Sequence, residues 1–165
     1  MKSTFLGLGT NLGNREGNLK EALHKIEETI GRIVAYSSVY ETEPSGFESE
    51  NEFLNMVVHV ETDLKPSGLL GRILMIEANL GRLRDAKKYS SRTIDIDILL
   101  YDKKIMSKVS LIIPHPLLHE RRFVLVPLCE IAPEGIHPVL KKTFTSLLKD
   151  CNDRSNVRKY KKSTH

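Results

Sequence analysis

The segment from Thr93 to Leu100 constrains this chain most, because a polar and an aliphatic residue alternate along its first six positions. A period of two predicts a β-strand. Successive side chains of a strand point to opposite faces, so each face would carry every second residue. One face would hold Ile94, Ile96, Ile98 and Leu100, and the other Thr93, Asp95, Asp97 and Leu99. The first face is typical of a protein core, and the second places two carboxylates side by side.

Asp95 and Asp97 would lie about 7 Å apart, where two anions repel by about 2 kcal/mol at an effective dielectric of ~20. One divalent metal ion, or a pair, would relieve that repulsion. Aspartate is depleted in strands, so this pair favours a binding site, with a solvated strand face as the alternative. Arg82, Arg84 and Arg92 precede the pair. Carboxylates with guanidinium groups beside them can hold magnesium and a polyphosphate together.

The remaining periodicities predict an α+β chain. We expect strands over 4–8, 33–41 and 53–62 and helices over 14–30 and 66–80, with the Asp95 strand after them. The order β-α-β-β-α-β is the ferredoxin-like arrangement. We read the polar stretch 82–91 as a loop that closes over a bound nucleotide.

Composition suits one domain over 1–165, since the chain has 165 residues of which 40% are hydrophobic. The net charge of +4 is located in residues 149–165, which carry six Lys or Arg and two Asp. We expect this basic segment to be a frayed, solvated end, and we expect no nucleic-acid partner.

Two cysteines, Cys129 and Cys151, are too few for a disulfide framework or a zinc site, and they suit a reducing cytoplasm. The amino terminus does not read as a signal peptide, and no stretch approaches the ~20 apolar residues of a membrane span. We therefore expect a cytoplasmic protein without a membrane partner. We expect a monomer, with a dimer as the alternative.

Several motifs follow one another along residues 3–138. The most specific is Arg92-Thr93-Ile94-Asp95-Ile96-Asp97-Ile98-Leu99. The others are Gly9-Thr10-Asn11-Leu12-Gly13, Tyr40-Glu41-Thr42 with Pro44 and Gly46, Phe53-Leu54-Asn55, Glu77, Gly81-Arg82-x-Arg84, Pro114-His115, Arg121 with Phe123, and Glu130-Ile131-Ala132-Pro133. In these segments the chain resembles the 6-hydroxymethyl-7,8-dihydropterin pyrophosphokinase family. The resemblance implies a ferredoxin-like core with additional carboxyl-terminal elements.

The resemblance also implies a reaction in folate biosynthesis, in which diphosphate passes from the co-substrate ATP to the hydroxymethyl group of a dihydropterin. The hydroxymethyl oxygen would attack the β-phosphorus, and AMP would leave. Such a transfer needs alignment and charge neutralisation more than covalent help. By resemblance, Asp95 and Asp97 bind two Mg²⁺ ions, and the catalytic residues are Asp95, Asp97, Arg82 and Arg92.

The two substrates are small molecules, and the resemblance implies a set of contacts for each. The ATP contacts would be Glu77, Arg84, Arg92, Ile98, Leu111, His115 and Arg121. The pterin contacts would be Thr42, Pro44, Gly46, Phe53, Asn55 and Phe123, with the two phenylalanines stacking on the ring and Asn55 reading its edge. Simpler readings remain: the phenylalanines as core, Glu77 in a surface ion pair, the arginines as exposed cations and His115 as a turn residue.

Some positions depart from the family pattern. They are Glu43, Ser45, Asp85, Tyr89, Ser90 and Pro116. All lie outside the Asp95 strand, so they affect loop details and leave the expected metal site unchanged.

Two other functions remain as alternatives: an RNA-binding module, which would need exposed aromatic residues on the central strands, and a metal-dependent phosphohydrolase using the same carboxylates.

Overall fold

A computed structural model describes residues 1–42, 52–81 and 93–161. Its strands are β1 (Lys2–Thr10), β2 (Gly31–Tyr36), β3 (Tyr40–Thr42), β4 (Phe53–Thr62), β5 (Asp95–Tyr101), β6 (Met106–Lys108), β7 (Leu111–Ile113) and β8 (Val157–Lys159). Its helices are α1 (Arg15–Thr29), α2 (Pro66–Gly81), α3 (Arg122–Ile131) and α4 (Phe144–Asp150), with a 3-10 turn η1 (Leu118–Glu120).

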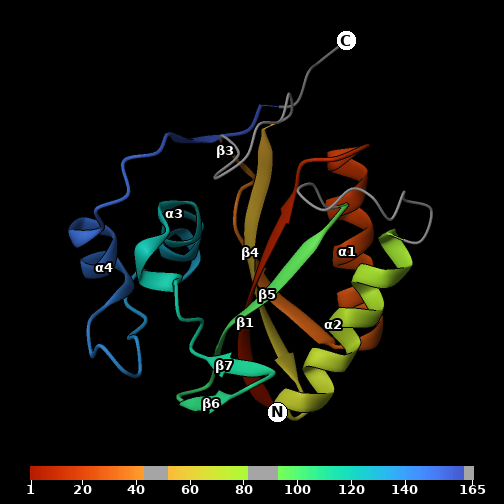
Figure 1. Cartoon of the computed structure of the whole chain (residues 1–165), viewed down its shortest axis with the longest axis horizontal. Coiled ribbons are helices and arrows are strands. Elements are labelled where there is room, and N and C mark those ends of the chain that lie inside the picture. The colour runs from red at the N-terminus through yellow and green to blue at the C-terminus, as the bar shows by residue number, and fades with distance from the viewer. Residues whose placement is uncertain (43–51, 82–92, 162–165) are drawn as a thin grey trace.

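One antiparallel sheet organises the molecule, and its strand order is β5-β1-β4-β3-β8, with β2 also paired to β4. The helices α1 and α2 lie on one side of this sheet, and α3 and α4 lie on the other (Figure 1). The expected α+β, ferredoxin-like core with additional carboxyl-terminal elements is confirmed. A separate hairpin of β6 and β7 follows β5.

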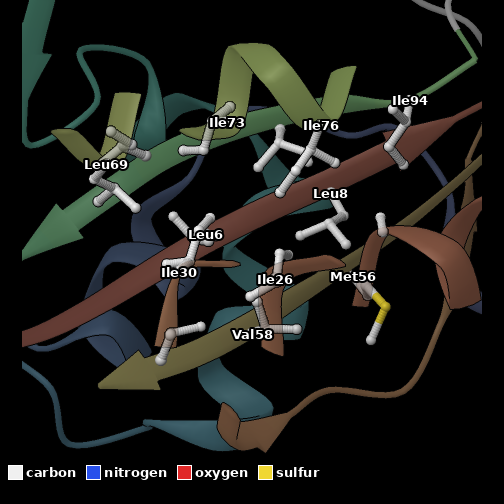
Figure 2. Packing of buried hydrophobic residues seen from close by; sticks show 14 of the residues in the cluster. Leu6, Leu8, Ile26, Ile30, Met56, Val58, Leu69, Ile73, Ile76 and Ile94 are labelled. Carbon is white, nitrogen blue, oxygen red and sulfur yellow. The ribbon is translucent and has the colours of Figure 1, made fainter. Parts of the chain in front are cut away.

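The larger core lies between the sheet and the helices α1 and α2 (Figure 2). The helix α1 begins where the Asn14 side chain accepts a hydrogen bond from the Gly17 N–H, which caps the first turn. Its inward positions at helical spacing meet every second residue of the central strands. The labelled side chains of this cluster are Leu6, Leu8, Ile26, Ile30, Met56, Val58, Leu69, Ile73, Ile76 and Ile94.

A second core cluster lies on the opposite face, beneath α3 and α4. Val57 and Leu99 from the sheet pack there against Leu125, Leu128 and Phe144. This cluster covers only part of that face, because Asp95, Asn55 and Phe53 lie beyond it near the other end of the strands. The uncovered part is where the candidate site lies.

Two strand predictions need correction. The expected strand 33–41 is divided into β2 and β3, because the Ser37 hydroxyl accepts the Val57 N–H at 3.0 Å and so replaces a backbone partner. The alternation along β5 breaks at Leu99, which is an extra residue in the ladder with β1. Leu100 therefore joins Leu99 in the second cluster instead of sharing a face with Ile98.

The expectation of a frayed end over 149–165 is wrong for the described residues up to Lys161. The helix α4 continues to Asp150, and β8 pairs with β3 in the register Thr42↔Val157 and Tyr40↔Lys159. Tyr160 then donates its backbone N–H to Val39 at 2.9 Å and its hydroxyl to Glu16 at 2.7 Å. The pattern is too short and too charged to be recognised as a strand without the partner strand in view.

Both cysteines are free, and Cys151 is buried in the second cluster. Each helix in the described part of the chain is too short or too polar to cross a membrane.

Candidate active site

Asp95 and Asp97 lie at the start of β5, half-exposed, while the residue between them is buried. In the ladder with β1, Asp95 lies opposite Gly9 and Asp97 lies opposite Gly7. The Gly9 position in turn lies opposite Asn55 on β4. Cross-strand partners point to the same face, so both carboxylates and the Asn55 amide share one face of the sheet. The sequence prediction of a strand face with two carboxylates is confirmed.

Side chains from the first helix anchor the segment just before β5. The Asn18 amide donates to the carbonyl of Leu12 at 2.8 Å and to that of Thr93 at 3.1 Å, and the Thr10 hydroxyl also donates to Thr93. These bonds tie the turn after β1 to the residue that precedes the aspartates. The sequence shows both segments but does not show that Asn18 joins them.

Glu77 of α2 reaches β5 from the other side. Its carboxylate accepts a hydrogen bond from the Ile96 N–H at 2.8 Å, between the two aspartates in sequence. Because β5 is an edge strand, this N–H would otherwise lack a partner in the sheet. Glu77 therefore has a structural role in addition to its expected contact with ATP, which stays a prediction.

His115 lies beside the carboxylate face, because its backbone N–H donates to the Leu99 carbonyl at 2.9 Å. Its ring Nδ1 accepts from the Leu117 N–H at 3.1 Å, so the neutral ring carries its proton on Nε2. Burial and the Arg121 cation lower the pKa of His115, and the Asp95 carboxylate opposes that shift. The ring is thus a hydrogen-bond donor through Nε2 even when it is neutral, as a phosphate ligand must be.

Arg121 and Phe123 stand at the start of α3. The Arg121 guanidinium carbon lies 5.5 Å from the centroid of the Phe123 ring. Phe123 is only partly buried at the margin of the second cluster. A stacked guanidinium beside a half-exposed ring presents a cation and an aromatic surface to the same region.

The expected pterin contacts on β3 and β4 also meet. The Asn55 amide nitrogen donates to the Thr42 hydroxyl at 2.8 Å, and both residues are buried. In this orientation Asn55 Oδ1 is directed toward Gly9, where an added Cβ would lie 3.0 Å from it. Phe53 is half-exposed and stands opposite Thr42.

Two further expected ATP contacts lie on β5 and on the β6-β7 hairpin. The Ile98 side chain is buried in the larger core, so a contact with ATP would fall to its backbone on the edge strand. Leu111, on β7, packs partly against the same core.

The remaining expected site residues, and the departures from the family pattern other than Pro116, lie outside the described residues. They are Pro44, Gly46, Arg82, Arg84 and Arg92, with Glu43, Ser45, Asp85, Tyr89 and Ser90; the nucleotide-closing loop 82–91 lies outside as well.

One charged cluster lies next to the expected pterin contacts on β3 and β4, and the sequence did not indicate it. The Arg158 guanidinium of β8 pairs with the carboxylates of Glu41 and Glu52, and Arg15 donates to the Glu52 carbonyl at 2.8 Å and pairs with Glu41 at 3.4 Å. Glu41 and Glu52 precede and follow the segment 43–51. Only the pairing of β3 with β8 brings Arg158 there, and no sequence spacing signals it.

The two carboxylates fit Mg²⁺ that arrives with a nucleotide. Among residues 1–42, 52–81 and 93–161, no group of three or more His, Cys, Asp or Glu side chains could hold a metal ion. Mg²⁺ commonly binds through one or two carboxylates, with waters and substrate phosphates as the other ligands. A pair of aspartates with a glycine opposite each of them agrees with that mode of binding.

Comparisons with known proteins point to one family. A family model described as 7,8-dihydro-6-hydroxymethylpterin-pyrophosphokinase (HPPK) matches residues 5–133. The "2-amino-4-hydroxy-6-hydroxymethyldihydropteridine pyrophosphokinase" of Aquifex aeolicus is 42% identical over 142 residues, which cover 86% of this chain and 88% of the relative. The protein of the same name from Methylorubrum extorquens is 44% identical over 135 residues, covering 81% and 85% of the two chains.

Among solved structures, the wild-type HPPK-DHPS protein of Plasmodium falciparum superimposes with a TM-score of 0.72 at 21% identity. The match covers 91% of this chain and 43% of that one, so the chain spans less than half the length of this solved relative. At this identity the likeness supports the fold alone.

Proposed function

The chain belongs to the 7,8-dihydro-6-hydroxymethylpterin-pyrophosphokinase family, and we propose that the face of β5 with Asp95 and Asp97 is its catalytic centre. The enzyme transfers diphosphate from ATP to the hydroxymethyl group of 6-hydroxymethyl-7,8-dihydropterin. The products are AMP and the dihydropterin-methyl diphosphate of folate biosynthesis.

In this proposal Asp95 and Asp97 hold two Mg²⁺ ions together with the phosphates of ATP. When bound, Mg²⁺ neutralises phosphate charge and orients the phosphate oxygens. The two carboxylates share a strand whose start is anchored by Asn18 and whose edge is bonded to Glu77. A fixed backbone supports the alignment that an in-line transfer requires.

The phosphates would lie between this strand and the start of α3. The charges of Arg121 and Asp95 both shift the pKa of His115, so these three groups surround the same region. There His115 would donate a hydrogen bond from Nε2, and Arg121 would supply a guanidinium. Glu77, Arg82, Arg84 and Arg92, with the backbones of Ile98 and Leu111, would complete the ATP contacts. Of these, Arg82 and Arg92 would stabilise the charge of the migrating diphosphate.

The pterin would lie over Gly9, where the sheet has no side chain. Phe53 and Phe123 would stack on its two faces, and Asn55 Oδ1 would accept from its edge, since Thr42 already takes the Asn55 amide nitrogen. Pro44 and Gly46 would add contacts from the segment 43–51. The hydroxymethyl oxygen then forms a bond to the β-phosphorus, the bond from that phosphorus to the bridging oxygen of AMP breaks, and the hydroxyl proton is released.

We also propose that the chain acts as one domain and as a monomer in the cytoplasm. Helices of the same chain cover much of both faces of the sheet, and two free cysteines suit a reducing compartment. Light scattering of the purified protein would test the oligomeric state.

The observation that carries the proposal is the alignment of Asp95, Gly9 and Asn55 across three strands. The test is AMP release from ATP in the presence and absence of 6-hydroxymethyl-7,8-dihydropterin, with Mg²⁺ and then with EDTA. We expect AMP only when the pterin and Mg²⁺ are both present. Hydrolysis of ATP at the same rate without the pterin would favour the phosphohydrolase alternative, and AMP formation in EDTA would contradict the metal site.

A further inference from the structure

Glu130 is the residue before the last in α3, and its carboxylate is bonded to the chain just before β3. It accepts the Ser38 N–H at 3.0 and 3.1 Å, the Ser38 hydroxyl at 2.8 Å and the Tyr40 hydroxyl at 2.7 Å. Both oxygens of the carboxylate are used. One side chain of α3 therefore fixes two residues at the junction between β2 and β3.

The charge on Glu130 is suited to this arrangement. Burial alone would raise the pKa of Glu130, but the hydrogen bonds from Tyr40 and Ser38, with the charge of Lys159, lower it below its ordinary value. Burial and the bond to Glu130 also raise the pKa of Tyr40 to about 12. At neutral pH the pair consists of an ionised acceptor and a neutral donor, which makes a charge-assisted hydrogen bond.

The junction leads directly to the pterin side of the site. β3 is only three residues long, and Tyr40 and Thr42 stand opposite Asn55 and Phe53 in the ladder with β4. Thr42 in turn accepts the amide hydrogen of Asn55 at 2.8 Å. The strand pairs with β4 on one side and β8 on the other, and the Glu130 bonds add a contact from α3 at its start.

Other bonds at this junction hold Val39 and Ser37, and the Val39 carbonyl accepts the Tyr160 N–H at 2.9 Å. Ser37 exchanges two hydrogen bonds with Val57, a donation from its N–H at 2.9 Å and an acceptance by its hydroxyl at 3.0 Å. These fix the end of β2 on β4. The Glu130 bonds join α3 to Tyr40 of β3 and to Ser38 just before it.

We propose that Glu130 is a positioning residue for pterin binding: it fixes the start of β3 and thereby the Thr42 hydroxyl that orients Asn55. Glu130 does not contact the substrate in this account. The inference rests on the proposed function, in which Thr42 and Asn55 contact the pterin.

The test is steady-state kinetics of Glu130→Gln with each substrate varied in turn. A Gln amide is neutral and has one acceptor oxygen where the carboxylate has two, so the bonds to Ser38 and Tyr40 lose their charge assistance and at least one hydroxyl must reverse its donor role. We expect the KM for the pterin to rise about tenfold, and the KM for ATP to stay within about twofold. Glu134→Gln is the matched control, because Glu134 is exposed and lies four residues further on; it should leave both constants unchanged.

This readout separates positioning from a general loss of structure. KM does not depend on how much of the enzyme is folded, so a purely structural defect would lower the apparent kcat and leave the pterin KM at its parental value. Tyr40→Phe removes one of the bonds and should raise the pterin KM less, in the same direction. The double variant should be no worse than Glu130→Gln alone, because the two side chains act through one contact.

Asn55→Ala distinguishes failure of this inference from failure of the proposed site. If Asn55→Ala raises the pterin KM and Glu130→Gln does not, the positioning role is wrong and the pterin site stands. If neither change raises it, the pterin site and the positioning role are both wrong. An equal rise in the KM for ATP and for the pterin in Glu130→Gln would also overturn the positioning role.

Discussion

Gly9 is the residue whose lack of a side chain matters most for the site. An added Cβ would lie 3.0 Å from Asn55 Oδ1 and 3.9 Å from the Phe53 ring, on the face where we place the pterin. Its backbone does not have the positive φ that only glycine adopts readily, in contrast to Gly13 at φ 70°. The requirement for glycine at this position is therefore one of space.

We predict that Gly9→Ala weakens pterin binding with little effect on stability. The methyl group would displace the Asn55 amide, and a misplaced contact of this kind costs about tenfold or more in the KM for the pterin. The KM for ATP should change much less. Kinetics with each substrate varied would show the difference.

Gly71→Ala on α2 is the matched control, because no atom lies within 4 Å of the added Cβ. Its kinetics should equal those of the parent. If Gly9→Ala also binds the pterin as the parent does, the pterin does not lie over Gly9.

At the scale of residues, the sequence identified the side chains that the family motifs contain. The faces of Asp95, Asp97 and Asn55 follow from alternation along a strand, so they could be predicted. The partners of Glu130 could not, because Ser38 and Tyr40 lie about 90 residues away and only the packing of α3 on the sheet brings them close. Long-range contacts between polar side chains leave no periodic signal in the sequence.

Among the elements, the carboxyl-terminal strand β8 changes the account of the chain most. It pairs with β3 on the side away from β4, so the short strand with Thr42 lies between two partners. The backbone of Tyr160 extends this contact to Val39, and its hydroxyl reaches Glu16 of α1. A segment that reads as a basic tail is thus part of the sheet.

We predict that deleting residues 157–165 destabilises the protein and impairs pterin binding. The deletion removes the ladder bonds of β8 and the partly buried Tyr160 side chain, so the melting temperature should fall by several degrees. The KM for the pterin should rise more than the KM for ATP, because β3 loses one neighbour. Thermal unfolding and kinetics of the truncated enzyme would test both effects.

A shorter deletion of residues 162–165 retains β8 and serves as the control. It should melt and react as the full chain does. Parental stability and a parental pterin KM after the longer deletion would contradict this prediction and favour a frayed, solvated end.

The elements that the sequence predicted well are those with long periodic patterns. α1 and α2 have inward-facing residues at helical spacing over four turns, and β4 is a ten-residue strand rich in apolar residues. The division between β2 and β3 depends on one serine hydroxyl, and β8 depends on its partner. Neither feature has enough residues to produce a pattern of its own.

Across the whole molecule, burial of histidines makes stability depend on pH. Burial lowers the pKa of His59, which stacks on Phe5 with ring centroids 4.4 Å apart, while the Glu61 charge opposes the shift. Burial and the nearby His119 lower the pKa of His137 as well. The unfolded chain binds protons at these residues more readily than the folded chain does, so stability falls as pH drops below about 6.5.

We predict that the melting temperature is lower at pH 5.5 than at pH 7.5, and that His59→Gln reduces this difference. The substitution removes one group whose pKa is lower in the folded chain than in the unfolded chain. His24→Gln, at an exposed position on α1, is the control and should leave the difference unchanged. A melting temperature that is the same at both pH values would contradict the predicted linkage.

The central claim is that Asp95 and Asp97 bind metal rather than support the fold, and one pair of measurements on Asp95→Asn and Asp97→Asn tests it. Turnover should fall about a thousandfold or more, because metal-dependent alignment and charge stabilisation are lost together. The melting temperature in EDTA should hold or rise slightly, because a repulsion of about 2 kcal/mol at most is relieved. Asp102→Asn, at the exposed residue directly after the same strand, should leave turnover unchanged. If both site variants melt well below the parent in EDTA and still form product at near-parental rates, the aspartates are structural and the metal site is wrong.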